Sequence, residues 1–430
     1  MSRLASVCSL SLLLALAPAA LADTLAVPQD FATIQAAVDA AVTGDTIVIS
    51  SGTYPGTVTL DGDSRLTLRA KGSVTIDATG LASGLVLLLC TDIRIERLRV
   101  LGGTSAGIFA DQCPGLVLDG CRVSGTTGRG FDIDECDAAQ FLRCRVKDVT
   151  STGARLVNCA DAVLSRWRIA GATDGLMLNV CDNALVEHCR LEDLTGQGLP
   201  LNSFFPGEVT NSIVTRNRIV GAQGGGIGLR GDGNLLERNL ILDGTGDGID
   251  LASGEQNDGN TLLRNRILRM DGMGLRASGT DNVLERNRGV DCTLDGINLQ
   301  NGAYQVLRNR LVRPGDEGIE VNTPGCTLED NRVVEPGEDG LLLQALADGA
   351  TCFANRVTRT GMNGVAIVCD DGKFTDNVSE AAGAAGFLLA GSNNALSLNR
   401  ATGSVGFDLE DTSDGSNTIA DDNHFGTTGP

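Results

Sequence analysis

Residues 217–251 read NRIVGAQGGGIGLRGDGNLLERNLILDGTGDGIDL, and this stretch decides the fold because it contains the same unit twice. Each unit begins with an asparagine, at Asn217 and Asn239, and has an isoleucine two positions later. Further on, Gly226 and Gly248 are each followed by the pattern apolar-x-apolar, in GIGL and GIDL. That alternation is typical of a short strand with one buried side. The stretch therefore predicts short strands separated by glycine-rich bends.

The unit recurs along most of the chain. Most intervals between equivalent positions are 22 to 24 residues, and two are longer. A fixed period on this scale is the signature of a solenoid of stacked units. The aligned positions are Leu98, Cys121, Cys144, Trp167, Cys189, Asn217, Asn239, Asn265, Asn287, Asn309, Asn331, Asn355, Asn377, Asn399 and Asn423.

Two solenoid classes share this period and the recurring asparagine. A leucine-rich repeat needs an L-x-L pair directly before the asparagine and a return helix after it, and the chain has neither. We therefore predict an all-β fold, a right-handed parallel β-helix of about 15 coils of 22 to 24 residues with a short N-terminal capping helix.

The first residues differ from the repeats. Residues 1–22 combine a positive start, an apolar stretch and a small-x-small end, which predicts a secretory signal peptide and a secreted or periplasmic product, with attachment to the cell surface left open. Residues 23–97 are predicted to form the cap and the first coils, and residues 98–430 the repeats. Within the cap, Ile34 and Val38 belong to an apolar stripe with helical spacing. A helix there would cover the open end of the β-helix.

The charge balance limits the partners. Lys and Arg number 34 against 54 Asp and Glu, which gives a formal net charge of −20. Nucleic acids and anionic membranes require a concentrated basic surface, so we expect no nucleic-acid partner and no membrane insertion. The oligomeric state is left open.

The aligned asparagines and the cysteines are predicted to be structural. A buried amide at a sharp bend can bond to the backbone and to the amide of the next coil. Cysteines take the equivalent place in the N-terminal coils, and a second cysteine column includes Cys90, Cys113 and Cys136. We expect buried, unpaired thiols in these columns, although disulfides between adjacent coils stay possible on spacing alone.

The segment DFATIQAAVDAAVTGDTIVISSGTYPGTV at residues 30–58 resembles the N-terminal cap of the pectin-lyase-like superfamily, and the coils resemble its parallel β-helix repeats. The resemblance extends from about residue 27 to the C-terminus and implies the right-handed β-helix fold. That superfamily includes pectate lyases, polygalacturonases, phage tailspikes and many non-catalytic secreted proteins. The sequence motifs of its pectate lyases, alginate epimerases, pectin methylesterases and polygalacturonases are absent. Only His188 and His424 are histidines, which argues against a histidine-based active site.

The strand after the recurring glycine offers the best place for a site, because its outward residues stack from coil to coil. The central outward position reads Asp250, Arg276, Asn298 and Glu320 along four coils. Hydrolysis of a glycosidic bond needs two carboxyl groups about 5 to 9.5 Å apart, and Asp295 with Glu320 fits that requirement. Elimination from a uronate would instead use a base and a neutralising group such as Arg276. The candidate catalytic residues are thus Asp250, Arg276, Asp295 and Glu320.

A second column lies just before the glycine and contains Asp295, Glu317 and Asp339. Carboxylates on adjacent coils would lie near 5 Å apart, so either a cation joins them or the pKa of one of them rises. These three residues are the candidate ligands of a calcium ion, the only cofactor that the sequence suggests. A plain solvated acidic face is the alternative.

Candidate substrate-binding residues complete the hypothesis. Asn298 and Asn322 belong to the outward columns, and Phe204 and Phe205 lie in an inserted loop. Aromatic rings in such a loop can stack on sugars or form a small core beneath the loop.

The leading functional hypothesis is a secreted protein that binds an extracellular polysaccharide. The presence of uronate in that polysaccharide is left open, as is its cleavage or modification by a polysaccharide lyase or glycoside hydrolase activity. The alternative is a non-catalytic surface or adhesive rod.

Overall fold

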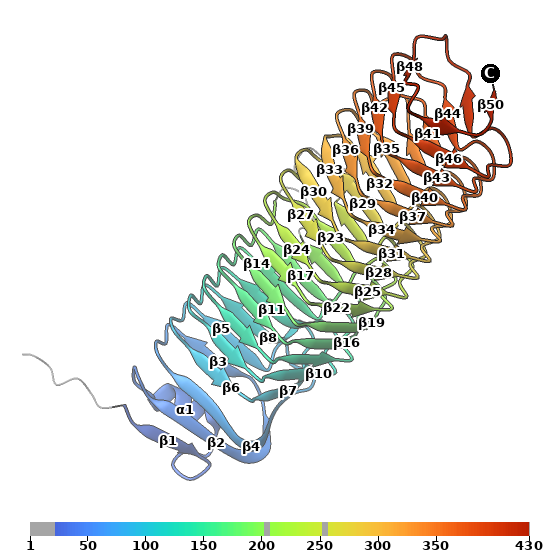
Figure 1. Cartoon of the computed structure of the whole chain (residues 1–430). Coiled ribbons are helices and arrows are strands. Elements are labelled where there is room, and N and C mark those ends of the chain that lie inside the picture. Colours follow the sequence, from blue (N-terminus) through green and yellow to red (C-terminus); the bar gives the residue numbers. More distant parts are fainter. Residues whose placement is uncertain (1–21, 202–206, 252–256, 430) are drawn as a thin grey trace, which may run out of the picture.

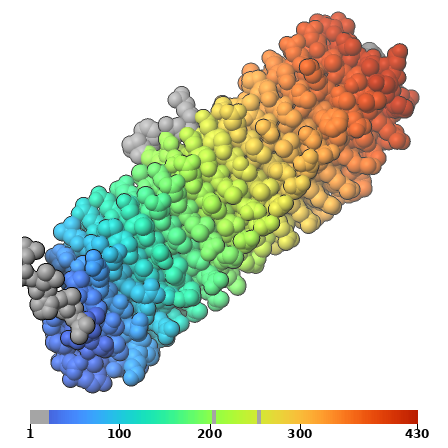
Figure 2. Space-filling view, turned by 60° about the vertical axis from the view of Figure 1, so that its left-hand side comes forward, coloured from blue at the N-terminus to red at the C-terminus, as the bar shows by residue number. Residues whose placement is uncertain are grey.

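The computed structural model describes residues 22–201, 207–251 and 257–429. Over these ranges the chain winds as a parallel β-solenoid whose coils stack into a long rod, from blue at the N-terminal end to red at the C-terminal end (Figure 1). The space-filling view shows the same continuous progression along the rod (Figure 2). Residues 1–21, nearly all of the predicted signal peptide, lie outside the described ranges. Among the described residues, no helix has the length and apolarity needed to cross a membrane.

Successive coils supply strands to three stacks, which we call sheets 1, 2 and 3. Sheet 1 precedes the bend at the aligned asparagine, sheet 2 follows that bend, and sheet 3 follows the glycine-rich bend. All the pairings between coils are parallel, as a solenoid with one strand per side requires.

Sheet 1 contains β6 (Arg94–Glu96), β9 (Val117–Asp119), β12 (Gln140–Leu142), β15 (Val163–Ser165), β18 (Leu185–Glu187), β21 (Ile213–Thr215), β24 (Leu235–Glu237), β27 (Thr261–Leu263), β30 (Asn282–Glu285), β33 (Tyr304–Leu307), β36 (Thr327–Glu329), β39 (Thr351–Phe353), β42 (Lys373–Thr375), β45 (Ala395–Ser397) and β48 (Thr418–Ile419). Sheet 2 contains β7 (Arg99–Gly102), β10 (Arg122–Ser124), β13 (Arg145–Lys147), β16 (Arg168–Ala172), β19 (Arg190–Leu194), β22 (Arg218–Val220), β25 (Leu240–Leu242), β28 (Arg266–Leu268), β31 (Arg288–Val290), β34 (Arg310–Val312), β37 (Arg332–Val334), β40 (Arg356–Thr358), β43 (Val378–Glu380), β46 (Arg400–Thr402) and β49 (His424–Phe425). Sheet 3 contains β3 (Val58–Asp61), β5 (Leu85–Leu88), β8 (Ala106–Asp111), β11 (Arg129–Asp134), β14 (Ala154–Val157), β17 (Leu176–Asn179), β20 (Leu199–Leu201), β23 (Ile227–Leu229), β26 (Ile249–Leu251), β29 (Leu275–Ser278), β32 (Ile297–Gln300), β35 (Ile319–Asn322), β38 (Leu341–Leu343), β41 (Val365–Ile367), β44 (Phe387–Leu389), β47 (Leu409–Asp411) and β50 (Thr428–Gly429).

The N-terminal coils have longer strands, β1 (Thr24–Val27), β2 (Thr46–Pro55) and β4 (Thr67–Ala78). One half of β4 pairs with β6 and the other half with β7, so that a single strand runs where later coils have two. These coils lack the asparagine bend, so an alignment of the repeats on that asparagine does not count them. The structure accordingly has about 18 turns, where the sequence predicted about 15.

The predicted capping helix is present as α1 (Ile34–Ala40), at the N-terminal end of the rod (Figure 1). The Thr33 hydroxyl accepts a hydrogen bond from the backbone N–H of Ala36, which satisfies a free amide of the first turn. Ile34, Ala37 and Val38 are buried, as the apolar stripe predicts. The helix thus covers the apolar end of the core.

The aligned asparagines form a continuous chain of hydrogen bonds from Asn217 to Asn423. They are buried from Asn217 to Asn399, and Asn423 at the end of the rod is half-buried. Asn309 is typical, because its Nδ2 donates to Asn331 Oδ1 at 3.0 Å and to the carbonyl of Leu284 at 2.7 Å. Its Oδ1 accepts from the backbone N–H of Asn287 at 2.8 Å. Each amide therefore satisfies bend backbone groups that water cannot reach.

Cysteines continue this arrangement into the N-terminal coils. The backbone N–H of Cys189 donates to Asn217 Oδ1 at 2.9 Å, so that the two residue types share one column. In the second column the backbone N–H of Cys90 reaches Cys113 Sγ at 3.4 Å. All twelve cysteines of the described ranges are free and buried. Trp167, in the same column as Cys189, is 1% exposed and belongs to the core, as expected.

The glycine before each sheet 3 strand is required by close packing between coils. A Cβ added at Gly318 would lie 2.3 Å from the carbonyl oxygen of Gly340 and 2.3 Å from Val333 Cγ1. No side chain tolerates such distances, so the bend admits only glycine.

The cysteines lead to a first prediction. Burial raises the pKa of Cys189 to about 12 and the pKa values of Cys292 and Cys326 to about 11, so these thiols stay protonated at neutral pH. We expect the native protein to react with almost none of its twelve described thiols in a colorimetric thiol titration, and with all of them after denaturation without reductant. A denatured protein with few free thiols would contradict the unpaired columns.

Candidate functional site

The central outward column of sheet 3 is arranged in the predicted register. Asp250 pairs with Arg276, Arg276 with Asn298, and Asn298 with Glu320 on successive strands β26, β29, β32 and β35. The next coil places Leu342 in the column, which ends its polar part. Parallel in-register pairing therefore brings these four polar side chains into one strip.

Arg276 is held by two carboxylates. Its Nε and Nη2 donate to Asp250 at 2.8 and 2.6 Å, in a two-point ion pair. Its Nε also lies 3.3 Å from Asp247 Oδ2. The pairing raises the pKa of Arg276, chiefly through the hydrogen bond with Asp250. Asp250 and Arg276 thus neutralise one another, and the guanidinium is not free to neutralise a substrate carboxylate.

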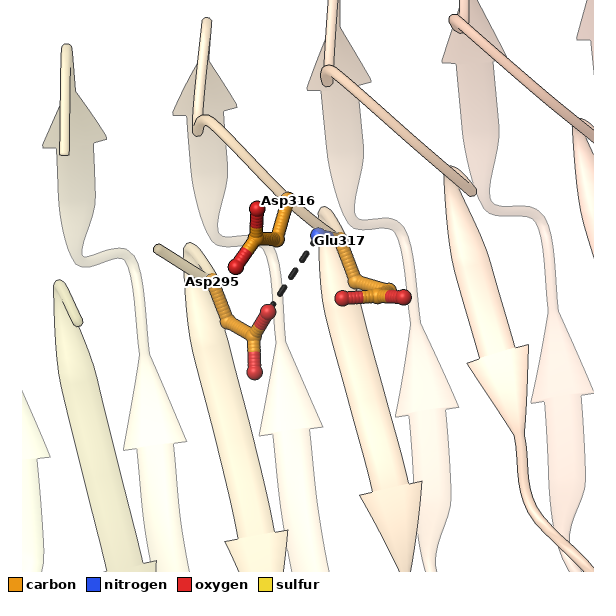
Figure 3. Close-up of side chains that lie close together, drawn as sticks. All are labelled: Asp295, Asp316 and Glu317. Carbon is orange, nitrogen blue, oxygen red and sulfur yellow. Dashed lines mark hydrogen bonds between the residues drawn. The ribbon is translucent and has the colours of Figure 1, made fainter. Parts of the chain in front are cut away.

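Asp295 is the centre of a separate acidic cluster. Ligand oxygens of Asp295, Asp316 and Glu317 lie within 4.8 Å of one another, on the bends that lead into β32 and β35 (Figure 3). We call these three residues together with Glu320 the acid site. Asn298 Nδ2 donates both to Asp295 Oδ2, at 2.8 Å, and to Glu320 Oε2, so that the amide joins the cluster to the strip.

Asp295 was predicted as a member of an acidic column whose orientation at the bend stayed open, and the structure shows that it is only 5% exposed. Its Oδ1 accepts the backbone N–H of Glu317 at 3.2 Å, which turns the side chain along the bend toward the next coil. The same interaction recurs in this column, where Asp339 Oδ1 accepts the N–H of Asn363 at 2.7 Å. Asp339 is likewise 7% exposed. The aspartates of this column, Asp247, Asp295 and Asp339, therefore each accept an amide of the next bend, whereas Glu317 is half-buried.

Burial and like charge raise the pKa of several members of the acid site. The pKa of Glu317 rises to about 8, because burial disfavours its charge and Asp295 adds a hydrogen bond and a negative charge. Burial also raises the pKa of Glu320, with a further contribution from Asp295. The pKa of Asp316 is also raised, mainly by burial. At neutral pH the acid site therefore holds a protonated carboxyl group.

Two glutamines extend this network. Gln344 Nε2 donates to Glu320 Oε1 at 2.9 Å, and Gln300 Nε2 donates to Asn298 Oδ1 at 2.9 Å. Gln300 and Gln344 stand in the same column as Asn322. Of these three residues, only Asn322 was predicted from the sequence to bind substrate. Asn322 lies exposed at the end of β35. Asn298 is 3% exposed, so its amide is occupied by the two carboxylates.

The remaining predicted residues fall into two groups. Phe204 and Phe205 lie outside the described residues. Asp339, predicted as the third metal ligand, does not join the group formed by Asp295 and Glu317, and Asp316 takes that place. The sequence DEG at residues 316–318 shows two adjacent acids in the bend, and only the second was considered.

A hollow of about 420 Å³ lies along the glycine-rich bends that lead into β23, β26 and β29, and its lining reaches Leu294, the residue before Asp295. Its polar lining includes Asp247, Asp250, Asp271 and Arg276. The bends contribute mostly glycines, which leave backbone and open space where side chains would stand. The strip therefore has a depression with room for a small polar unit such as a sugar.

The donor set at the acid site suits a hard cation. Asp295, Asp316 and Glu317 offer only carboxylate oxygens, the ligand type that calcium prefers, and water would supply the rest of its six to eight ligands. A cation there would reduce the repulsion among these carboxylates.

Comparisons with known proteins agree with this architecture. A family model described as a right handed beta helix region matches residues 83–227 and 273–425. This match covers more than half of the chain, so the protein belongs to that right-handed β-helix family. The fold class predicted from the repeats is thereby confirmed. A comparison with curated protein sequences found no match.

Several solved structures are similar at low identity. The catalytic domain of a GH87 α-1,3-glucanase in complex with nigerose matches at 14% identity and a TM-score of 0.42, covering 72% of this chain and 63% of that domain. The chain therefore spans less than two thirds of the glucanase domain. The surface adhesin PfbA of Streptococcus pneumoniae matches at 10% identity and a TM-score of 0.47, covering 81% of this chain and 92% of the adhesin. The receptor-binding tailspike of bacteriophage Det7 matches at 11% identity and a TM-score of 0.41, covering 82% and 73% of the two chains.

Proposed function

We propose that this protein is exported and binds an extracellular polysaccharide along the polar strip of sheet 3, where the acid site cleaves a glycosidic bond by hydrolysis. The observation that supports this proposal is the pair of neighbouring carboxyl groups at Asp295 and Glu317, since the pKa of Glu317 rises to about 8. A glycosidase requires one carboxyl group that is protonated near neutral pH and a second one close by. In this proposal Glu317 or Glu320 donates the proton to the leaving oxygen, and Asp295 assists as the second carboxyl group.

Hydrolysis is favoured over elimination by the state of Arg276. A lyase needs a positive group to neutralise the substrate carboxylate, and here Asp250 and Asp247 already neutralise that arginine. Arg276 and Asp250 are therefore proposed to shape the binding strip. A calcium ion at Asp295, Asp316 and Glu317 would instead tie up the acid, and so competes with hydrolysis in this proposal.

A non-catalytic rod is the second candidate, and one observation favours it. The bond from Asp295 to the next coil's amide recurs at Asp247 and Asp339, where no acidic cluster exists among the described residues. Part of the role of Asp295 is therefore structural.

Activity on a polysaccharide panel tests the proposal. We expect new reducing ends from at least one extracellular polysaccharide, without the absorbance of unsaturated uronates. Glu317→Gln and Glu320→Gln are tested separately, and the variant that removes the proton donor is expected to lower kcat at least about 100-fold, because general acid or base catalysis contributes on that scale. Glu410→Gln is the matched control, because Glu410 occupies the same column of sheet 3 at β47 and should leave activity unchanged. Binding without turnover on every polymer would favour the non-catalytic rod, and absence of both would refute the proposal.

A further inference from the structure

Sheet 2 carries a row of arginines on its outer face. Strands β7, β10, β13 and β16 begin with Arg99, Arg122, Arg145 and Arg168, and the pairing register places each directly beside the next. All four side chains are exposed. At the usual distance between parallel strands, about 4.8 Å, these four residues form a row about 14 Å long. We call them the arginine row.

No acid neutralises the arginine row. Within the described residues, none of the four guanidinium groups forms an ion pair. Partial burial lowers the pKa of Arg122, and the charges of Arg145 and Arg99 lower it further. Like charges side by side on adjacent strands oppose folding.

Neighbouring columns show that the chain can avoid this repulsion. One bend column alternates in sign, with Asp243 bound to Arg269 and Asp291 bound to Arg313. The arginine before the bend is also paired, for example Arg143 with Asp119. Among the described residues, the position that opens the sheet 2 strand repeats a positive charge over four coils without an ion pair at the arginine row, and again at Arg266, Arg288, Arg310 and Arg332. Such a repeat on the surface suits contact with an external anion, and the arginine row is the run that also lines hollows.

Two hollows lie along the row. The first, of about 480 Å³, is lined by Arg99, Arg122 and Arg145, together with Arg97 and Arg143 of the preceding column. Gly120 also lines the first hollow and stands between Arg97 and Arg143 in the preceding column. Because glycine has no side chain, the surface is open at that position. The second hollow, of about 370 Å³, continues from Arg145 to Arg168 and includes Lys147 beside apolar side chains. It ends at Arg190, which is paired with Glu192. Because both hollows share Arg145, they form one cationic track.

We propose that the arginine row is a binding site for a linear polysaccharide that carries sulfate or carboxylate groups. Guanidinium groups bind such anions through paired N–H donors, and a row along the rod suits a polymer with charges at regular intervals. The site lies on a different sheet from the acid site and in more N-terminal coils, so it stands whether or not the acid site is catalytic.

A polysaccharide fits the track better than a nucleic acid does. The chain has a net charge of −20, and the row is one guanidinium wide with Asp119 at its edge, whereas a duplex needs a broad basic surface. The residues that line the two hollows include no aromatic side chain on which single-stranded bases could stack.

The test compares two double variants of the full exported chain. Arg122→Gln with Arg145→Gln removes two charges from the row, whereas Arg269→Gln with Arg313→Gln removes two charges from paired positions. The probes are fluorescent heparin, polygalacturonate, neutral dextran and a DNA duplex, titrated at about 50 and 200 mM salt. We expect heparin, polygalacturonate or both to bind at low salt and dextran not to bind. The row variant should weaken that binding at least about tenfold, and the paired control less than about twofold.

Three results would overturn the proposal: no binding of either acidic polysaccharide at low salt, equal loss in both variants, or tighter binding of DNA than of the polysaccharides. Arg168→Gln alone is a milder second variant should the double variant not fold, and it is expected to weaken binding severalfold. Glu320→Gln at the acid site should leave heparin binding unchanged, which separates failure of this site from failure of the proposed hydrolysis.

Discussion

Replacing Asn309 with leucine is expected to lower the free energy of unfolding by about 3 kcal/mol. The substitution leaves the backbone N–H of Asn287 and the carbonyl of Leu284 without their partners in a buried bend. Each such group costs on the order of 1 to 3 kcal/mol. Leucine itself fits the column, since Leu98 occupies the equivalent position in an earlier coil. The loss should therefore reflect the unsatisfied polar groups, and urea denaturation followed by circular dichroism measures it.

Asn322→Leu is the matched control for this experiment. Asn322 has the same side chain but lies exposed at the end of β35, so we expect a change within about 0.5 kcal/mol. Equal stability of the Asn309 variant and the wild-type protein would mean that the amide chain adds nothing to the stability of the rod.

The fold could be predicted because its determinants are local and repeat. Each coil carries its own bend asparagine and its own glycine, so a single period read along the chain places every strand. In-register pairing then follows, and the column Asp250, Arg276, Asn298 and Glu320 was predicted in the correct order. The N-terminal coils were predicted within residues 23–97 but could not be counted, because β2 and β4 pass straight through the place where later coils bend.

The candidate site was harder to predict because side chains at bends can turn either way. The orientation of Asp295 and Asp339 could not be predicted, and each bonds to an amide of the following coil and is buried. Asp316, which joins the acid site, directly precedes Glu317 of the predicted column. The arginine row could have been predicted from the sequence, because an arginine follows each of four successive aligned positions. The net charge of −20 was used instead, and a net charge does not show a local positive surface.

Replacing Glu317 with glutamine is expected to stabilise the protein above about pH 8 and to have little effect near pH 4. The pKa of Glu317 rises from an ordinary 4.5 to about 8 in the folded protein. The folded state therefore binds this proton more tightly than the unfolded state does, and stability falls as the pH increases from 4.5 to 8. Glutamine carries no proton to lose, so the variant should melt about 2 °C or more above the wild type at high pH.

Calcium should reverse the same destabilisation in the wild-type protein. A cation bound by Asp295, Asp316 and Glu317 requires their charged forms, so about 1 mM calcium should raise the melting temperature at pH 8 more than at pH 5. Glu317→Gln removes one ligand and should reduce this response, whereas the control Glu410→Gln should retain it. Melting curves of the Glu317 variant and the wild type that differ by the same amount at every pH would show that this carboxyl group titrates normally. If calcium leaves the melting curves unchanged at both pH values, no cation binds at this site. That result would not affect the buried acid or the proposal of hydrolysis that rests on it.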